Sequence, residues 1–205
     1  MADKIYFYPV WLRIWHWANA ALFLILIFTG LSMQYSAPDK PIIRFDLAVS
    51  IHNICGILLV LGYLLFFTGN IVSKNGKYYK MRFKGIYKLL LNQIRYYVIG
   101  IFKGEIPPFP VNEGRKFNPL QQFIYVMVMY IGLPITLLTG LGLLFPEIIL
   151  EQFLGFSGMF YTSLLHVITG FLLSIFMCVH IYFCTIGATW TSNFRGMIDG
   201  WHEAH

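Results

Sequence analysis

Four histidines lie in or beside long apolar runs of the 205-residue sequence, where ionisable side chains are usually functional. They are His16, His52, His166 and His180. Neutral imidazole is a common ligand of transition metals and of haem iron. None of the apolar runs contains an Asp or Glu that could complete a zinc or di-iron site. Two imidazoles that face each other across a helical bundle would suit the two axial positions of a haem iron.

Each histidine could instead be a packing residue whose ring is hydrogen-bonded to a neighbouring carbonyl. The spacing of two of these histidines helps to distinguish packing from ligation. His166 and His180 are fourteen positions apart. In a helix this is about 1400° of rotation, roughly 40° short of four turns, and a rise of about 21 Å. One helix face would therefore present both imidazoles, at two depths.

The composition supplies the elements that must position these residues. The chain is 58% hydrophobic and 12% charged, whereas soluble domains contain about 25% charged residues. Four apolar runs are each long enough to cross about 30 Å of hydrocarbon, which excludes a water-soluble enzyme and the short strands of a membrane barrel. The runs cover roughly 15–35, 47–72, 120–145 and 160–186. We expect one all-α domain over 1–205, an integral membrane bundle of four transmembrane helices.

The distribution of positive charge predicts the topology. Ten of the fifteen Lys and Arg residues lie in segment 73–118, between the second and third runs. Because cytoplasmic loops are enriched in Lys and Arg, this segment and both termini should be cytoplasmic. Only Lys40 and Arg44 then lie outside. The net charge of +6 thus reports topology, and no nucleic-acid partner is expected.

The topology pairs the histidines by depth. His16 and His180 should lie near the inner surface, and His52 and His166 near the outer surface. The sequence therefore predicts two haems, one at each level, with all four histidines as ligands. No Cys-x-x-Cys-His motif is present, so the haems should be b-type.

A weak internal repeat relates the two halves of the bundle. Thr-Gly-Leu occurs at 29–31 and 139–141, and His-x-x-x-Gly at 52–56 and 166–170. The four glycines are expected at the outer level, where they could leave space for a flat macrocycle or allow close helix packing. They are Gly30, Gly56, Gly140 and Gly170.

Each haem would need further partners. Arg13, one turn before His16, is the candidate for the propionates of the inner haem. At the outer level the only cations are Lys40 and Arg44, which could instead flank the membrane span. Each ligating histidine should donate its second ring nitrogen to a carbonyl or hydroxyl that the sequence does not identify.

The cytoplasmic segment contains an amphipathic pattern. Between Phe83 and Ile101, apolar residues recur at spacings of three and four, with Lys84, Lys88 and Arg95 among them. This pattern predicts an interfacial helix that lies on the inner leaflet.

In order and spacing, six segments match one family. They are 13–17, 29–31, 52–56, 117–125, 134–141 and 166–200. Over nearly its whole length the chain resembles the di-haem cytochrome b membrane subunits of the bacterial b561-like group, found in formate dehydrogenase, nickel-iron hydrogenase and thiosulfate reductase complexes. Asn118-Pro119-Leu120-Gln121 departs from the Asn-Ala-Gly-Gln form of the formate dehydrogenase members, so the resemblance is closer to the thiosulfate reductase members.

The resemblance implies a site for menaquinone or ubiquinone at the cytoplasmic side. Asn118, Gln121 and the surroundings of His180 are the positions that correspond to it. Asn118 and Gln121 also fit a helix cap, because Asn118 precedes Pro119 and Gln121 follows three residues later. A cap does not exclude contact with a quinone.

The resemblance also implies the function. We expect an electron-transfer subunit of an oxidoreductase complex in the bacterial inner membrane, rather than a stand-alone enzyme. It would carry electrons between the quinone pool and a periplasmic iron-sulfur or multihaem cytochrome c subunit. The alternative is a transporter whose histidines bind a metal or relay protons.

Overall fold

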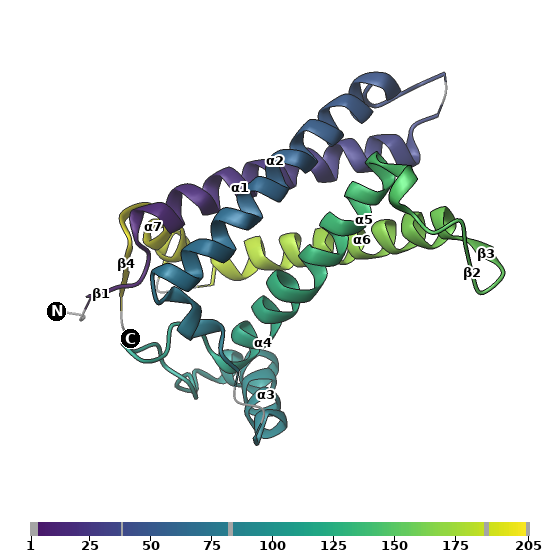
Figure 1. Ribbon diagram of the computed structural model, residues 1–205. Helices are drawn as coiled ribbons and strands as arrows, with labels where there is room; N and C mark the ends of the chain where they lie inside the picture. The colour runs from purple at the N-terminus through teal and green to yellow at the C-terminus, as the bar shows by residue number, and fades with distance from the viewer. Residues whose placement is uncertain (1–3, 38, 82–83, 187–188, 204–205) are drawn as a thin grey trace. The chain divides into compact units, whose positions relative to one another are not determined.

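The computed structural model describes residues 4–37, 39–81, 84–186 and 189–203, and within these ranges four long helices dominate (Figure 1). Each is long and apolar enough to cross a membrane. Three are continuous: α1 (Val10–Tyr35), α2 (Phe45–Val72) and α6 (Gly158–Cys184); the fourth covers Pro119–Leu144. The predicted four-helix membrane architecture is confirmed. The observed helix α1 starts earlier than predicted, because helical structure continues beyond the apolar run into the turn that holds Trp11 and Arg13.

The third span along the chain, Pro119–Leu144, is interrupted near its middle. It consists of α4 (Pro119–Met127), a π-helical turn (Val128–Gly132) and α5 (Leu133–Leu144). Pro134 has no N–H to donate to the carbonyl of Tyr130, so a regular α-helix cannot continue through this point without an unpaired carbonyl. The π-helical turn is a local change of hydrogen-bond register of the kind that often marks functional sites.

The chain divides into two compact units. The first, here called the bundle unit, contains residues 14–68 and 132–183. The second, here called the terminal unit, contains residues 1–13, 69–131 and 184–205. The terminal unit therefore includes the four helix ends that the predicted topology places at the cytoplasmic face.

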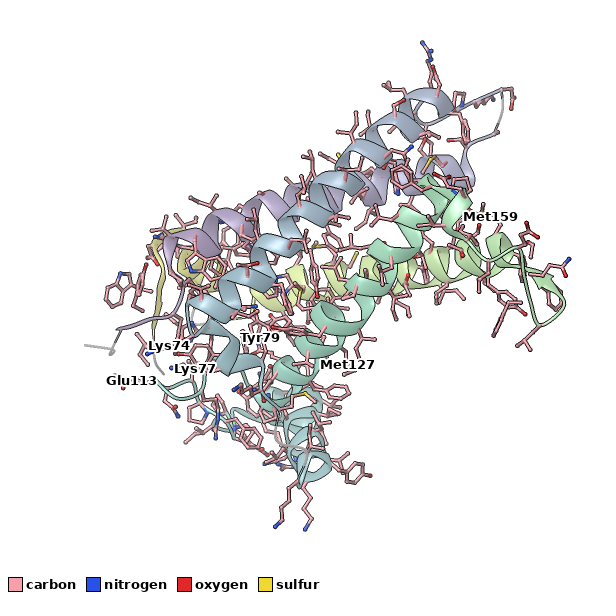
Figure 2. All side chains as sticks on the ribbon, in the orientation of Figure 1. Lys74, Lys77, Tyr79, Glu113, Met127 and Met159 are labelled. Carbon is pink, nitrogen blue, oxygen red and sulfur yellow. The ribbon has the colours of Figure 1, made fainter. Side chains whose placement is uncertain are left out.

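Within the bundle unit, α1 packs on α2 through aromatic and small residues. Trp15 Nε1 donates a hydrogen bond of 2.7 Å to the carbonyl of Gly62, and its ring stacks on Phe66 at a centroid distance of 4.4 Å. Phe66 is fully buried. The large side chains on the opposite faces remain exposed, as Figure 2 shows along the helices. A chain of this kind has its outward faces against lipid rather than water.

A short hairpin connects α5 to α6 in the bundle unit (Figure 1). Its strands are β2 (Gln152–Phe153) and β3 (Phe156–Ser157), joined through a turn at Leu154 and Gly155, both with positive φ. A 3₁₀ turn, η5 (Pro146–Ile148), precedes it. The whole connection is short and contains no domain of its own.

In the terminal unit the two ends of the chain pair with each other (Figure 1). β1 (Lys4–Tyr6) and β4 (Trp201–Glu203) run antiparallel, with Ile5 opposite His202. Helix α7 (Ser192–Asp199) precedes β4 and ends at Gly200, whose φ of 92° is readily available to glycine. The carbonyl of Gly200 accepts hydrogen bonds from the backbone N–H groups of Phe7 and Tyr8.

The segment between the second and third spans is largely helical. It contains η1 (Asn75–Tyr79), α3 (Ile86–Arg95), the π-helical η2 (Tyr96–Gly100) and η3 (Ile101–Lys103). The predicted amphipathic helix corresponds to α3 and η2, although Phe83 lies outside the described residues. Tyr87 and Val98 expose 70% and 64% of their surface, whereas Gln93 is buried. The placement of this helix on the inner leaflet stays a prediction.

Gly69 provides a test of the packing between the ends of α1 and α2. A Cβ added at Gly69 would lie 2.7 Å from the ring of Trp11, whereas one added at Gly62 would lie 3.9 Å from Trp15 Nε1. Gly69→Ala should therefore cost about 1–3 kcal/mol of unfolding free energy through overpacking. We expect a lower Tm for this variant in detergent and an unchanged or higher Tm for Gly62→Ala. An equal Tm for the two variants would contradict the packing described here.

Candidate functional site

The four histidines all belong to the bundle unit, where they form two pairs. The ring centroids of His16 (α1) and His180 (α6) are 6.2 Å apart, with an angle of 60° between the rings. Those of His52 (α2) and His166 (α6) are 6.3 Å apart, with an angle of 74°. The structure thus brings together the same partners that were paired by depth in the sequence.

These separations fit a shared metal ion. Two imidazoles whose nitrogens each lie roughly 2.0–2.1 Å from one ion have ring centres about 6 Å apart. Among the residues that the structure describes, no group of three or more His, Cys, Asp or Glu side chains could hold a metal. A donor set of two opposed imidazoles suits the axial positions of a haem, whose macrocycle supplies the remaining ligands.

Hydrogen bonds fix the orientation of His52. The Thr29 hydroxyl lies 2.8 Å from the carbonyl oxygen of Ile25 in its own helix, to which it donates, and 2.9 Å from His52 Nδ1. Because the hydroxyl hydrogen is used within α1, the network assigns the proton of the imidazole to Nδ1, which donates to the Thr29 oxygen. The lone pair of Nε2 is then free to bind a metal.

The same arrangement occurs in the other half of the repeat. The Thr139 hydroxyl donates to the carbonyl of Ile135 at 2.8 Å, and His166 Nδ1 lies 3.1 Å from both the Thr139 hydroxyl and the carbonyl oxygen of Thr136. These are the second-nitrogen partners that the sequence analysis required but did not identify. A hydrogen bond of this type orients a ligating ring and raises its basicity.

The four repeat glycines divide into two groups. A Cβ at Gly30 would lie 3.6 Å from His52 Cε1, and one at Gly140 would lie 3.1 Å from His166 Cε1. Gly140 therefore makes room for the His166 ring, whereas a Cβ at Gly30 would be in ordinary van der Waals contact with the His52 ring. A Cβ at Gly56 or Gly170 would meet no described atom within 4 Å, so these positions leave space of the kind that a macrocycle would need.

The inner pair has a different environment. The rings of Trp17 and His16 lie 5.3 Å apart edge to face, and Phe176 stacks on His180 at 5.7 Å. Within the described part of the chain, His16 Nδ1 and Asn19 Oδ1 are buried without a hydrogen-bond partner. Buried polar atoms without a partner are rare in proteins and require an explanation such as an absent group.

The candidate propionate partners are placed differently from one another. Arg13 Nη1 donates to the carbonyl of Ile198 in α7, whereas Arg13 Nε is buried with no partner among the described residues. Arg44 forms an exposed ion pair with Asp46 at 2.6 Å. Lys40 follows the C-terminal end of α1, where its backbone N–H donates to the carbonyl of Ala37.

The candidate quinone residues form a capping box at the start of α4, as the cap alternative predicted. Asn118 Oδ1 accepts from the Gln121 N–H at 2.9 Å, and Gln121 Oε1 accepts from the Asn118 N–H at 3.2 Å. Asn118 Nδ2 also donates to the Tyr97 hydroxyl at 2.8 Å. Both residues belong to the terminal unit and His180 to the bundle unit.

A buried aromatic cluster, which no sequence pattern indicated, lies beside this cap. The ring of Phe117 lies 4.9 Å from Tyr125 and 5.7 Å from Tyr79, and Tyr79 lies 5.7 Å from Tyr130. Burial raises the pKa of Tyr79 above its ordinary value. Lys116, which the sequence analysis used only as a topology charge, is buried next to Phe117 with 5% of its surface exposed.

Comparisons with known proteins agree with this geometry. The chain is 38% identical to a "Putative cytochrome YdhU" of Escherichia coli (strain K12) over 201 residues, which is 98% of this chain and 76% of that protein. It is 26% identical to a "Probable Ni/Fe-hydrogenase B-type cytochrome subunit" of Rhizobium leguminosarum bv. viciae over 154 residues, which is 69% of this chain and 60% of that protein. No solved structure matches.

The family comparison covers almost the whole chain. The sequence model described as "Prokaryotic cytochrome b561" matches residues 7–200, a range that includes all four spans and both histidine pairs. This match, the haem-compatible pairs and the four membrane-spanning helices agree on a multi-pass b-type cytochrome of the bacterial inner membrane. The chain belongs to the prokaryotic cytochrome b561 family.

Proposed function

We propose that this membrane b-type cytochrome is the di-haem electron-transfer subunit of an oxidoreductase complex and connects a periplasmic partner to the quinone pool at the cytoplasmic side. The observation that carries the proposal is the presence of two histidine pairs with nearly equal ring separations, 6.2 Å and 6.3 Å. His16 and His180 would hold the inner haem, and His52 and His166 the outer one. Bound there, the haems would accept and release single electrons across the hydrocarbon layer.

The chain's own residues prepare the outer site before a haem binds. Thr29 and Thr139 hold the Nδ1 protons of the outer histidines, so Nε2 is presented as a ligand without a change of tautomer. Gly140 allows the His166 ring to approach the neighbouring helix closely. With all four histidines as ligands, the bound haems would supply electron transfer rather than oxygen chemistry.

The quinone site is proposed at the start of α4. Asn118 and Gln121 lie there with the aromatic cluster beside them, and the predicted topology places this end at the cytoplasmic face. A quinone head group needs an apolar aromatic contact surface and hydrogen-bonding partners near water. The resemblance to the family also associates the position of His180 with the quinone.

A partner subunit must supply the chemistry of the other substrate. The outward connections are the short segments 36–44 and 145–157, which contain only turns and a small hairpin. The relative from Rhizobium leguminosarum is named as a hydrogenase cytochrome subunit. By analogy, we propose a periplasmic iron-sulfur or multihaem cytochrome c subunit as the redox partner of this chain.

Removal of one histidine from each pair tests the ligand assignment. His180→Ala should remove the inner haem and His52→Ala the outer one, so each variant should keep about half of the haem, while the double variant should be colourless. Dithionite-minus-oxidised absorbance spectra and the haem-to-protein ratio of the purified chain measure this. Loss of both haems in each folded single variant, or of neither, would show that the pairing is wrong.

A larger side chain at Gly170 tests whether this glycine provides space for a haem or allows close helix packing. Because no described atom lies within 4 Å of an added Cβ, Gly170→Leu should leave the haem-free fold intact but should reduce the content of outer haem to less than half. The control is Leu172→Phe, which adds bulk at a position that is 57% exposed on the same helix. Full haem content in folded Gly170→Leu would show that the space at Gly170 is not used by the macrocycle.

The threonine hydroxyls should tune the outer haem. In Thr29→Val the shape is kept but His52 Nδ1 loses its acceptor, so the ring becomes less basic and the outer site loses about 10- to 100-fold in affinity. Redox titration should show a higher potential for the outer haem only. Thr169→Val is the control, because the Thr169 hydroxyl donates to the carbonyl of Leu165 in its own helix at 2.7 Å. Equal titrations for both variants would argue against the role of Thr29.

A further inference from the structure

The terminal unit contains a buried ammonium group that the electron-transfer function does not explain. Lys116 is only 5% exposed. Its Nζ donates to the carbonyl of Phe7 at 3.1 Å and to Asn75 Oδ1 at 3.2 Å. Its remaining surroundings are aromatic: the ring centroid of Tyr8 lies 4.4 Å from Nζ and that of Tyr78 lies 5.5 Å away.

No carboxylate balances this charge within the described residues. The ion pairs formed there are Arg44–Asp46 and Arg95–Glu105, and neither includes Lys116. A buried charge without an opposite charge is costly, and a buried lysine responds by releasing its proton more easily. Accordingly, burial lowers the pKa of Lys116 from 10.5 to about 7. Near neutral pH the amine can therefore both accept and release a proton.

A line of hydrogen bonds leads away from Lys116. Asn75 Nδ2 donates to Asn70 Oδ1 at 2.6 Å, and Asn70 Nδ2 donates to the Tyr130 hydroxyl at 3.3 Å. Together with the bond from Lys116 to Asn75, every bond in the line points in the same direction. The line reaches Tyr130, which lies in the π-helical turn of the third span and in the aromatic cluster.

The backbone holds this line in place. Lys74 has a φ of 57°, an uncommon value for a residue other than glycine, and it turns the chain from α2 into η1. A Cβ at Gly76 would lie 2.9 Å from the carbonyl oxygen of Asn70. Only glycine therefore allows η1 to approach the end of α2 closely enough to bring Asn75 to Asn70. Both asparagines are 5% exposed.

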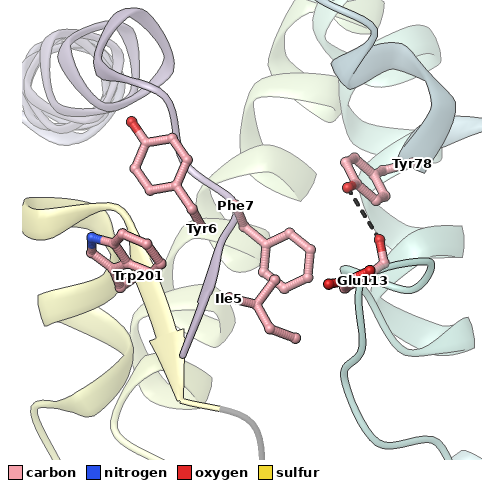
Figure 3. A pocket seen from close by; sticks show the side chains of 6 residues that line it. All are labelled: Ile5, Tyr6, Phe7, Tyr78, Glu113 and Trp201. Atoms are coloured by element: carbon pink, nitrogen blue, oxygen red, sulfur yellow. Dashed lines mark hydrogen bonds between the residues drawn. The ribbon is translucent and has the colours of Figure 1, made fainter. Parts of the chain in front are cut away.

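The terminal unit also contains an open pocket of about 380 Å³ (Figure 3). Its lining residues are Ile5, Tyr6, Phe7, Tyr78, Glu113 and Trp201. Two of them are also contacts of Lys116: the Phe7 carbonyl accepts a hydrogen bond from Lys116 Nζ, and the ring centroid of Tyr78 lies 5.5 Å from it. The Tyr78 hydroxyl donates to the carbonyl of Glu113 at 3.4 Å.

We propose that Lys116 transfers protons between water in this pocket and the hydrogen-bonded line that reaches Tyr130, and thereby supplies or removes the protons of quinone turnover. The proposal rests on the quinone chemistry proposed above for the start of α4. It assigns to Lys116 a role in proton transfer and no contact with the quinone.

In quinone reduction, quinone takes up two protons and two electrons to become quinol, and bound haem would supply the electrons. For each proton, Lys116 Nζ passes one proton to Asn75 Oδ1 while Asn75 Nδ2 releases one to Asn70 Oδ1. Asn70 Nδ2 then releases one to the Tyr130 oxygen, and the phenol gives its own proton to the quinone oxygen. Neutral Lys116 regains a proton from water, and the amides return to their resting tautomers. Quinol oxidation reverses each step.

Other titratable or charged groups surround Lys116. Tyr8 and Tyr78 face it, and burial raises the pKa of Tyr8 to about 12, so Tyr8 stays neutral near pH 7. Lys77 and Glu113 contact or bond to Tyr78 from the exposed side. Two further titratable groups are His202, whose ring lies 6.3 Å from that of Phe7, and Cys184, whose thiol interacts electrostatically with Tyr8. His202→Gln is therefore a necessary control for any transition near pH 7.

A direct titration tests the proton exchange without any turnover. The chain with its bound haem is labelled with ¹³Cε-lysine, and the lysine signals are followed by NMR from pH 5 to 11. One of the nine lysine signals should titrate near pH 7, should persist in His202→Gln and should be absent in Lys116→Arg. If every lysine titrates near pH 10 or above, the proposal is overturned.

Kinetics then test whether the exchange serves quinone turnover, with menadiol as the reductant and the rate of haem reduction as the readout. Neutral Lys116 is the form that accepts protons from quinol, so the rate in the wild-type chain should rise as the pH increases through about 7. Lys116→Met and Lys116→Arg should both be about 100-fold slower and should lack this transition. Arg keeps the charge and donor groups, so restoration of the rate by Arg would show a structural role and overturn the proposal.

The control variant is Lys77→Met, because Lys77 lies 4.7 Å from the ring of the same Tyr78 but is exposed. It should behave as the wild-type chain. If menadiol does not reduce the haem of the wild-type chain, the proposed quinone function fails. If it does and folded Lys116→Met with full haem content reacts at the wild-type rate, only the role of Lys116 fails. If Lys116→Met does not fold, Asn75→Leu interrupts the line one step later and should show the same loss.

Discussion

Hydrocarbon offers no hydrogen bonds, and this constraint governs the placement of the polar groups of the chain. Within the bundle unit, the hydroxyl hydrogens of Thr29 and Thr139 are used by their own helices, so their oxygens can only accept from a second group. The histidines of the facing helices provide that group. The need to satisfy every hydrogen-bond donor therefore places the proton of these imidazoles on Nδ1. Nε2 keeps its lone pair and can bind a metal.

The internal repeat explains the outer site more fully than the inner one. Each half contributes a threonine, a glycine against the histidine ring, and a histidine from the next helix, so the outer pair is nearly symmetrical. The inner pair combines His16 and His180, which are not equivalent in the repeat. Its surroundings are aromatic, and they include polar atoms of His16 and Asn19 that have no partner in the described chain.

The sequence predicted the features that depend on periodicity and composition. Four apolar runs identified the membrane helices to within a few residues, and helical rise with topology paired the histidines. The repeat predicted that the glycines share one level but not that Gly30 and Gly140 lie against imidazoles, because ring contacts depend on helix rotation. The burial of Lys116 could not be predicted for a similar reason. A lysine in a cationic loop has the same sequence pattern whether it is exposed or buried, and the contacts of Lys116 come from segments about 40 and 110 positions away.

The pairing of β1 with β4 has a consequence for biosynthesis. All four spans lie between residues 4–6 and 201–203 in the sequence, so this strand pair cannot form until the spans have been translated. The backbone of Phe7 is bonded on one side to Gly200 and on the other to Lys116. The surroundings of Lys116 therefore assemble after all four spans have been synthesised. A ribosome that stalls before α7 would release a chain that has its hydrophobic helices but lacks the residues that complete the surroundings of Lys116.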